Sequence, residues 1–194
     1  MYITGDGGYP GLWIDGLSGL LSLKVPPIPF SREEMKIEIK RARDAIVRVK
    51  PKALIFGGSL FGGGLIFSHP VKELADVARE NGAVVGFDGS HVLGLIAGKR
   101  FQAPLKEGAN ALFGSTHKSL FGPQGGIILA NKEHGEVIKA RIYLRFVDNV
   151  HWNRIAALTL ALAEVKRFGG EIWLHRVLPS HNGFQGLGEG QKTG

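Results

Sequence analysis

The order of apolar and polar positions predicts strands and helices that alternate along most of the chain. Short apolar runs are followed by segments in which apolar residues recur every three or four positions, the spacing that places them on one face of a helix. The expected strands are 2–4, 20–25, 53–57, 83–88, 110–114 and 126–130, and the expected helices are 31–50, 70–82, 132–142 and 153–168, with a short helical or irregular piece between 88 and 110. Strands that alternate with helices are typical of an α/β fold with a mostly parallel sheet.

Local signals mark where several of these helices begin and end. Ser31-Arg32-Glu33-Glu34 has the pattern of a capping box, which predicts a helix start at Ser31, and Pro51 ends that helix. Pro70 suits the first turn of the next helix, and Asn81-Gly82 suits its end. The residues expected to face the core are Met35, Ile39, Ala42, Ile46 and Val49 in the first helix, Val71, Leu74, Ala75 and Ala78 in the second, and Ile155, Leu158, Leu162 and Val165 in the last.

The composition is that of a globular protein with one sizeable core, because 44% of the 194 residues are apolar and 21% are charged. The net charge is +7, but the basic residues are mixed with acids and form no basic–aromatic stripe, so nucleic-acid binding is not favoured. The absence of cysteine excludes disulfides and cysteine-based metal sites, and no metal is expected. Neither a secretory signal nor an apolar run of membrane-spanning length is expected, which makes a cytoplasmic location the default and a membrane partner unexpected.

Residues 1–170 are expected to form one domain. Residues 171–194 are expected to form a divergent, flexible tail, because the stretch from Ser180 onward has no apolar period and few apolar residues.

Two residues at expected strand ends carry the chemistry of greatest interest. Asp88 closes the apolar run 83–88, and Lys118 lies 30 positions later (118 − 88) in the loop Ser115-Thr116-His117-Lys118-Ser119. Ligands of parallel sheets bind beyond the carboxyl ends of the strands. Pyridoxal phosphate (PLP) needs a lysine for its Schiff base and a carboxylate that keeps its pyridinium nitrogen protonated. The pair therefore indicates a PLP site, although a surface lysine and a turn-forming aspartate remain the alternative interpretation.

Several neighbours of this pair are further candidates. They are His91, Ser59, Ser115, Thr116 and His117. His91 either bonds the phenolic oxygen of the cofactor or stacks on its ring, or it is a helix-face histidine satisfied by the backbone. The hydroxyls of Ser115 and Thr116 either donate to the cofactor or complete a turn. His117 is more typical of a packing residue than of a catalyst, and Ser59, after Gly57-Gly58, is a weaker candidate of the same kind.

Two segments together resemble serine hydroxymethyltransferases. Phe87-Asp88-Gly89-Ser90-His91-Val92-Leu93-Gly94-Leu95-Ile96-Ala97 is similar to the family's Asp-x-x-His-x-x-Gly-Leu segment. Ser115-Thr116-His117-Lys118-Ser119, followed by Gly122-Pro123-Gln124-Gly125-Gly126, is similar to its Thr-Thr-His-Lys-Thr and Gly-Pro-Arg-Gly-Gly lysine loop. The resemblance covers roughly residues 1–170. It implies the three-layer α/β/α large domain of fold-type I PLP-dependent enzymes, PLP as cofactor, and a homodimer with sites shared across the interface.

The resemblance also implies residue roles. Lys118 would be the Schiff-base lysine, Asp88 the pyridinium partner, and His91 and Ser59 contacts to the cofactor edge. Thr116 and His117 would lie beside the phosphate and the lysine.

Three positions depart from the family pattern. Tyr9, in Gly7-Gly8-Tyr9, stands where the family has a ring-stacking histidine, so it either stacks on the cofactor or belongs to a turn with Pro10-Gly11. Gln124 stands where many members have arginine. The segment 146–153 replaces the glycine-rich loop that reaches the neighbour's phosphate, and within it His151 either serves the cofactor or has no role.

The activity implied by the resemblance is an aldol-type cleavage at the α-carbon of serine, glycine or a β-hydroxy amino acid. Family members are much longer, so the chain is expected to lack the phosphate cup and the arginine that binds the substrate carboxylate. Two alternatives follow: a truncated large domain that keeps the fold with weak or no PLP binding and without turnover, and a basic interaction module.

Overall fold

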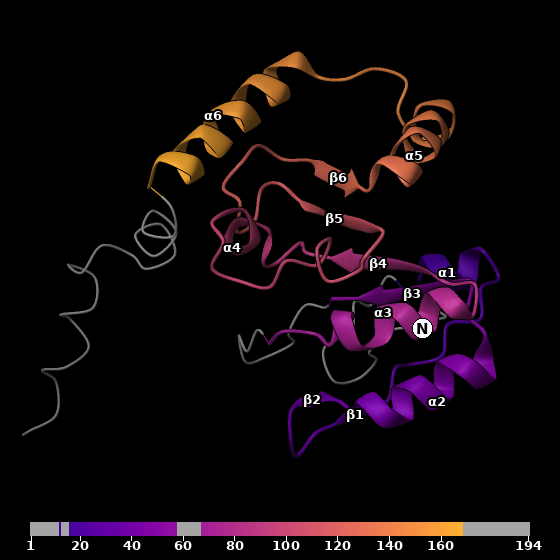
Figure 1. Ribbon diagram of the computed structural model, residues 1–194. Coiled ribbons are helices and arrows are strands. Elements are labelled where there is room, and N and C mark those ends of the chain that lie inside the picture. Colours follow the sequence, from indigo (N-terminus) through magenta and orange to yellow (C-terminus); the bar gives the residue numbers. More distant parts are fainter. Residues whose placement is uncertain (1–11, 13–15, 58–66, 169–194) are drawn as a thin grey trace, which may run out of the picture.

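A four-stranded sheet forms the centre of the computed structural model, which describes residues 12, 16–57 and 67–168 (Figure 1). The strand order is β3-β4-β5-β6, with β3 at Ala53–Phe56, β4 at Val84–Asp88, β5 at Ala111–Ser115 and β6 at Gly126–Ala130. Strands β3, β4 and β5 are parallel, and β6 runs antiparallel to β5 at the edge. The prediction of an α/β fold with a mostly parallel sheet is therefore confirmed.

The longer helices lie near the two edges of the sheet, which are formed by β3 and β6. Figure 1 shows α2 and α3 beside the β3 end of the sheet and α5 and α6 beside the β6 end. The helices are α1 Leu17–Leu20, α2 Ile39–Val49, α3 Val71–Glu80, α4 Leu93–Ala97, α5 Lys132–Arg145 and α6 Trp152–Phe168, and a small antiparallel pair consists of β1 Phe30–Ser31 and β2 Lys36–Ile37. No described helix combines the length and the hydropathy needed to cross a membrane.

The core lies against one face of the sheet. The alternate strand residues Leu54, Phe56, Val85, Phe87 and Leu112 are all buried and belong to one hydrophobic cluster. The predicted inner face of α3 belongs to the same cluster, since its four expected residues are all buried. Between these positions, Ile55 is partly exposed and Gly86 is buried as well. The packed face of β3, β4 and β5 therefore supports the strand ends at which the candidate residues lie.

The predicted helix start at Ser31 is wrong. Ser31 ends β1, and its Oγ accepts the Glu34 backbone N–H at 3.2 Å inside the turn that leads to β2. The Ser-x-x-Glu pattern thus makes a local hydrogen bond that a turn uses as well as a helix does. The helix begins at Ile39, and Met35, which was expected in its buried stripe, has a positive φ of 51° and is exposed.

The predicted strand 20–25 is also wrong. Helix α1 ends at Leu20, and Ser22 follows with a φ of 53°. The Ser22 N–H donates to the Gly19 carbonyl at 2.9 Å, and the Leu23 N–H donates to the Ser18 carbonyl at 2.7 Å. These two bonds form a Schellman motif, which uses the backbone groups that a strand would need for pairing. The expected strand 2–4 lies outside the described residues.

The last predicted helix is present, but its inner face is shifted. Leu158 and Val165 pack against the core, whereas Ile155 and Leu162 are exposed and Ala161 is buried instead. In the first long helix, Ala42 and Ile46 are buried as predicted, whereas Ile39 and Val49 are exposed. The expected boundary at residue 170 and the expected tail 171–194 lie outside the described residues and stay predictions.

Candidate cofactor site

Asp88 and Lys118 come together around one imidazole. Asp88 is the last residue of β4, and Lys118 lies in the loop after β5, the neighbouring strand. The Nζ atom of Lys118 is 3.3 Å from Nε2 of His91. The pKa of His91 is lowered mainly by burial and further by the positive charge of Lys118, while the negative charge of Asp88 opposes the shift. Both predicted groups thus act on His91, and the interpretation of His91 as a residue satisfied by backbone alone is not what the geometry shows.

The position of Asp88 is set by its backbone and by its own turn. Its Oδ1 accepts the Ser90 N–H at 2.9 Å, the local bond of a turn-forming aspartate. Gly57, directly after β3, has a φ of 98°, and a methyl group there would overlap the Asp88 carbonyl oxygen. The end of β3 therefore touches the backbone of Asp88, and this contact requires glycine.

The lysine loop is closed by its own hydrogen bonds. The Thr116 N–H donates to the Gly125 carbonyl at 3.0 Å, and the Gly122 N–H donates to the Thr116 carbonyl at 2.7 Å. The Thr116 side chain is buried, and its hydroxyl donates to the Pro123 carbonyl at 2.6 Å. This hydroxyl therefore completes a turn, which was one of the two roles considered for it.

Two serines that the sequence reasoning missed connect the two halves of the site. The Ser90 hydroxyl accepts the Ser115 N–H at 3.2 Å, and the Ser119 hydroxyl accepts the Gly94 N–H at 3.1 Å. The first bond joins the turn after β4 to the end of β5, and the second joins the lysine loop to the first turns of α4. The only signal in the sequence was that each serine lies inside one of the two motif segments.

The other candidate residues make contacts of their own in or near the lysine loop. His117 is exposed, and its Nδ1 accepts the Gly125 N–H over a long 3.5 Å. Ser115 ends β5 opposite Gly126. His151 lines a cavity of about 270 Å³ together with Thr116, Gly125 and Arg154, between the lysine loop and the start of α6. Tyr9 and Ser59 lie outside the described residues.

The donor set of the described residues fits PLP. An amine, a carboxylate and an imidazole that its lowered pKa keeps uncharged at neutral pH lie around the ends of β4 and β5. These are the groups required for a Schiff base, for a pyridinium nitrogen and for a polar contact to the ring edge.

The fold matches that of a solved structure, L-threonine transaldolase from Pseudomonas fluorescens in its internal aldimine state. The TM-score is 0.75, the sequence identity is 22%, and the match covers 89% of this chain and 39% of that chain. The match shows that this chain shares its fold with part of that enzyme.

Sequence comparison then gives the family. The family model for serine hydroxymethyltransferase matches residues 22–149, and the chain belongs to this family. It is 48% identical over 164 residues to the serine hydroxymethyltransferase of Methanocaldococcus jannaschii and 44% identical over 170 residues to that of Thermococcus kodakarensis. These matches cover 84% and 86% of this chain but 37% and 38% of the two relatives, so the chain spans little more than a third of their length.

Proposed function

We propose that this chain forms the PLP-binding part of a serine hydroxymethyltransferase-type enzyme. The proposed substrate is serine, glycine or a β-hydroxy amino acid, and the proposed reaction is an aldol-type cleavage at the α-carbon. The proposed assembly is a homodimer, by analogy with the family. The observation that supports the cofactor assignment most directly is the 3.3 Å separation of Lys118 Nζ from the imidazole of His91, on which the charge of Asp88 also acts.

Each of the three residues has a defined task in this proposal. Lys118 would hold the cofactor covalently through Nζ, and the carboxylate of Asp88 would accept the hydrogen of the pyridinium nitrogen. PLP, when bound, supplies an electron-accepting ring that stabilises negative charge at the α-carbon of the amino acid.

The task of His91 follows from its lowered pKa. Burial and the charge of Lys118 keep the pKa below its ordinary value of 6.5, so the imidazole is mostly uncharged at neutral pH. Nζ of Lys118 lies within hydrogen-bonding distance of Nε2 of His91, which accepts from the amine in the tautomer that carries its proton on Nδ1. His91 therefore holds the amine near the end of β4 before any cofactor arrives.

A second candidate is a large domain that keeps the fold without turnover and binds PLP weakly. It is favoured by the lysine loop, because the Thr116 hydroxyl proton is already used on the Pro123 carbonyl and His117 contacts its own loop. The family resemblance implies that Thr116 and His117 lie beside the phosphate and the lysine, and both side chains make hydrogen bonds within their own loop.

Borohydride reduction separates these possibilities. The chain is mixed with equimolar PLP, reduced, digested and mapped by mass spectrometry. The expected result is one modified peptide that contains Lys118, its loss in Lys118→Ala, and its retention in Lys106→Ala, which removes an exposed lysine. An adduct that survives in Lys118→Ala would overturn the assignment. Turnover of serine by the unmodified chain then distinguishes an enzyme from a domain that only binds.

A further inference from the structure

The 3.3 Å contact between Lys118 and His91 joins two separate segments of the chain. His91 follows β4 and Lys118 follows β5, and the pairing of these two strands ends with Asp88 opposite Phe113. The histidine therefore lies three residues (91 − 88) and the lysine five residues (118 − 113) beyond the last pair of the ladder. Contacts other than the strand ladder must set the distance between the amine and the imidazole.

Hydrogen bonds to two serine hydroxyls lie on either side of this contact. Before it, the Ser90 hydroxyl accepts the Ser115 N–H at 3.2 Å. After it, the Ser119 hydroxyl accepts the Gly94 N–H at 3.1 Å. One serine directly precedes the histidine in the sequence, and the other directly follows the lysine. A shift of either segment that broke one of these bonds would therefore also change the distance between the amine and the imidazole.

The bond of Ser119 is made at the start of helix α4. The first N–H groups of a helix have no partner within the helix, and Gly94 is the buried second residue of α4, so its N–H needs an acceptor from elsewhere. Leu120, the next residue of the lysine loop, is buried and lines a small apolar cavity together with Leu93 of α4. Apolar packing has no preferred direction, whereas a hydrogen bond does, so the serine is the residue that orients the loop on α4.

We propose that Ser119 is a positioning residue, which holds the Lys118 amine beside His91 through its bond to the start of α4. Ser90 holds the histidine segment in the same way, through its bond to Ser115. Both serines act through the two residues that they adjoin. The proposal rests on the proposed function, because it takes the roles of the amine and the imidazole from there and adds the residues that set their separation.

Titration of His91 followed by nuclear magnetic resonance tests this positioning without PLP. Burial lowers the pKa of His91 most, the charge of Lys118 lowers it further, and the charge of Asp88 opposes the shift. Ser119→Ala should let the amine move away and admit water, so the pKa of His91 should rise toward 6.5. Lys118→Ala removes the positive charge altogether and gives the rise that corresponds to complete loss of the contact. The signal of His91 is identified by its absence in His91→Gln.

Two matched variants separate positioning from stability. Ser119→Thr keeps the hydroxyl and should leave the pKa of His91 unchanged. Ser31→Ala removes a bond of the same kind, in which a serine hydroxyl accepts a backbone N–H at 3.2 Å, from the turn between β1 and β2. Any loss of stability in this control should leave the pKa of His91 unchanged. If Ser119→Ala does not fold, Ser90→Ala makes the same test from the other segment, with the same expected rise.

A time course of borohydride trapping relates this positioning to the cofactor. Ser119→Ala should form the adduct ~tenfold more slowly than the unmodified chain, since displacement of a reacting group by about 1 Å can cost about 100-fold in rate. An unchanged pKa of His91 in the folded serine-to-alanine variants, or an unchanged trapping rate, would overturn the proposal. If the unmodified chain forms no adduct at Lys118, the proposed function is refuted, and the titration of His91 alone then decides whether the serines hold the pair together.

Discussion

Replacing Gly57 by alanine should destabilise the protein more than the same change at Gly82. Both glycines have positive φ, 98° and 78°, and a left-handed backbone costs other residues about 1–2 kcal/mol. The surroundings differ. A methyl group at Gly82 would have nothing within 4 Å, whereas one at Gly57 would overlap the Asp88 carbonyl oxygen and lie 2.8 Å from its carbonyl carbon and 3.0 Å from its Cα.

The difference between the two variants measures how tightly β3 packs on Asp88. Gly82→Ala carries the conformational cost alone, so a loss of about 1 kcal/mol is expected. Gly57→Ala adds the overlap with backbone atoms, for which overpacking of about 1–3 kcal/mol is typical, so a total of about 3 kcal/mol is expected.

Urea unfolding followed by far-UV circular dichroism gives both values, with Gly82→Ala as the matched control. Gly57→Ala should also reduce borohydride trapping of PLP, because relief of the overlap must displace Asp88, and Gly82→Ala should not. Equal losses of stability in the two variants would refute the argument that the end of β3 determines the position of Asp88.

Two further changes test the loop and a buried histidine. Thr116→Val leaves the Pro123 carbonyl without its 2.6 Å donor and should cost about 1–3 kcal/mol in urea unfolding, whereas Thr159→Val on the exposed side of α6 should stay within about 0.5 kcal/mol. Burial among three phenylalanine rings lowers the pKa of His69 to about 4. Between pH 6.5 and pH 4, His69 is therefore protonated in the unfolded chain but not in the folded chain. The free energy of unfolding should fall by about 3 kcal/mol as the pH drops through this range. His69→Phe should remove this fall, and an unchanged difference in unfolding free energy between pH 7 and pH 4 would contradict the argument.

The elements that the sequence predicted well are those in which an apolar period and an end signal coincide. Helix α3 has both, since Val71, Leu74, Ala75 and Ala78 recur at helical spacing between Pro70 and Asn81-Gly82, and all four are buried. Strand β4 combines an apolar run with Asp88 at its end, which gave the position of the candidate carboxylate.

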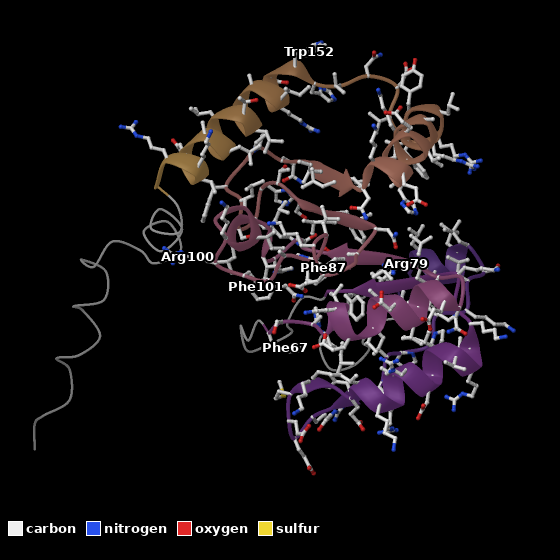
Figure 2. All side chains as sticks on the ribbon, viewed as in Figure 1. Phe67, Arg79, Phe87, Arg100, Phe101 and Trp152 are labelled. Atoms are coloured by element: carbon white, nitrogen blue, oxygen red, sulfur yellow. The ribbon has the colours of Figure 1, made fainter. Side chains whose placement is uncertain are left out.

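The errors arose where one local signal serves two structures. Ser31 makes its hydrogen bond to Glu34 in the turn between β1 and β2, where the same Ser-x-x-Glu pattern serves as it would at a helix start. The bonds of Ser90 and Ser119 could not be predicted, since each joins residues 25 positions apart and depends on how β4 and β5 pair. The exposure of aromatic side chains also differs between elements: Figure 2 shows Trp152 extending outward from the start of α6, whereas Phe87 lies within the body of the molecule.

The antiparallel pairing of β5 with β6 makes the length of the lysine loop as important as its residues. Ser115 pairs with Gly126, and four further pairs fix the register of these two strands. Inserting or deleting one residue between them would slip this register and turn every β6 side chain to the opposite face of the sheet, unless the loop itself bulged. The position of the Lys118 amine therefore depends on the number of residues between the paired ends of β5 and β6.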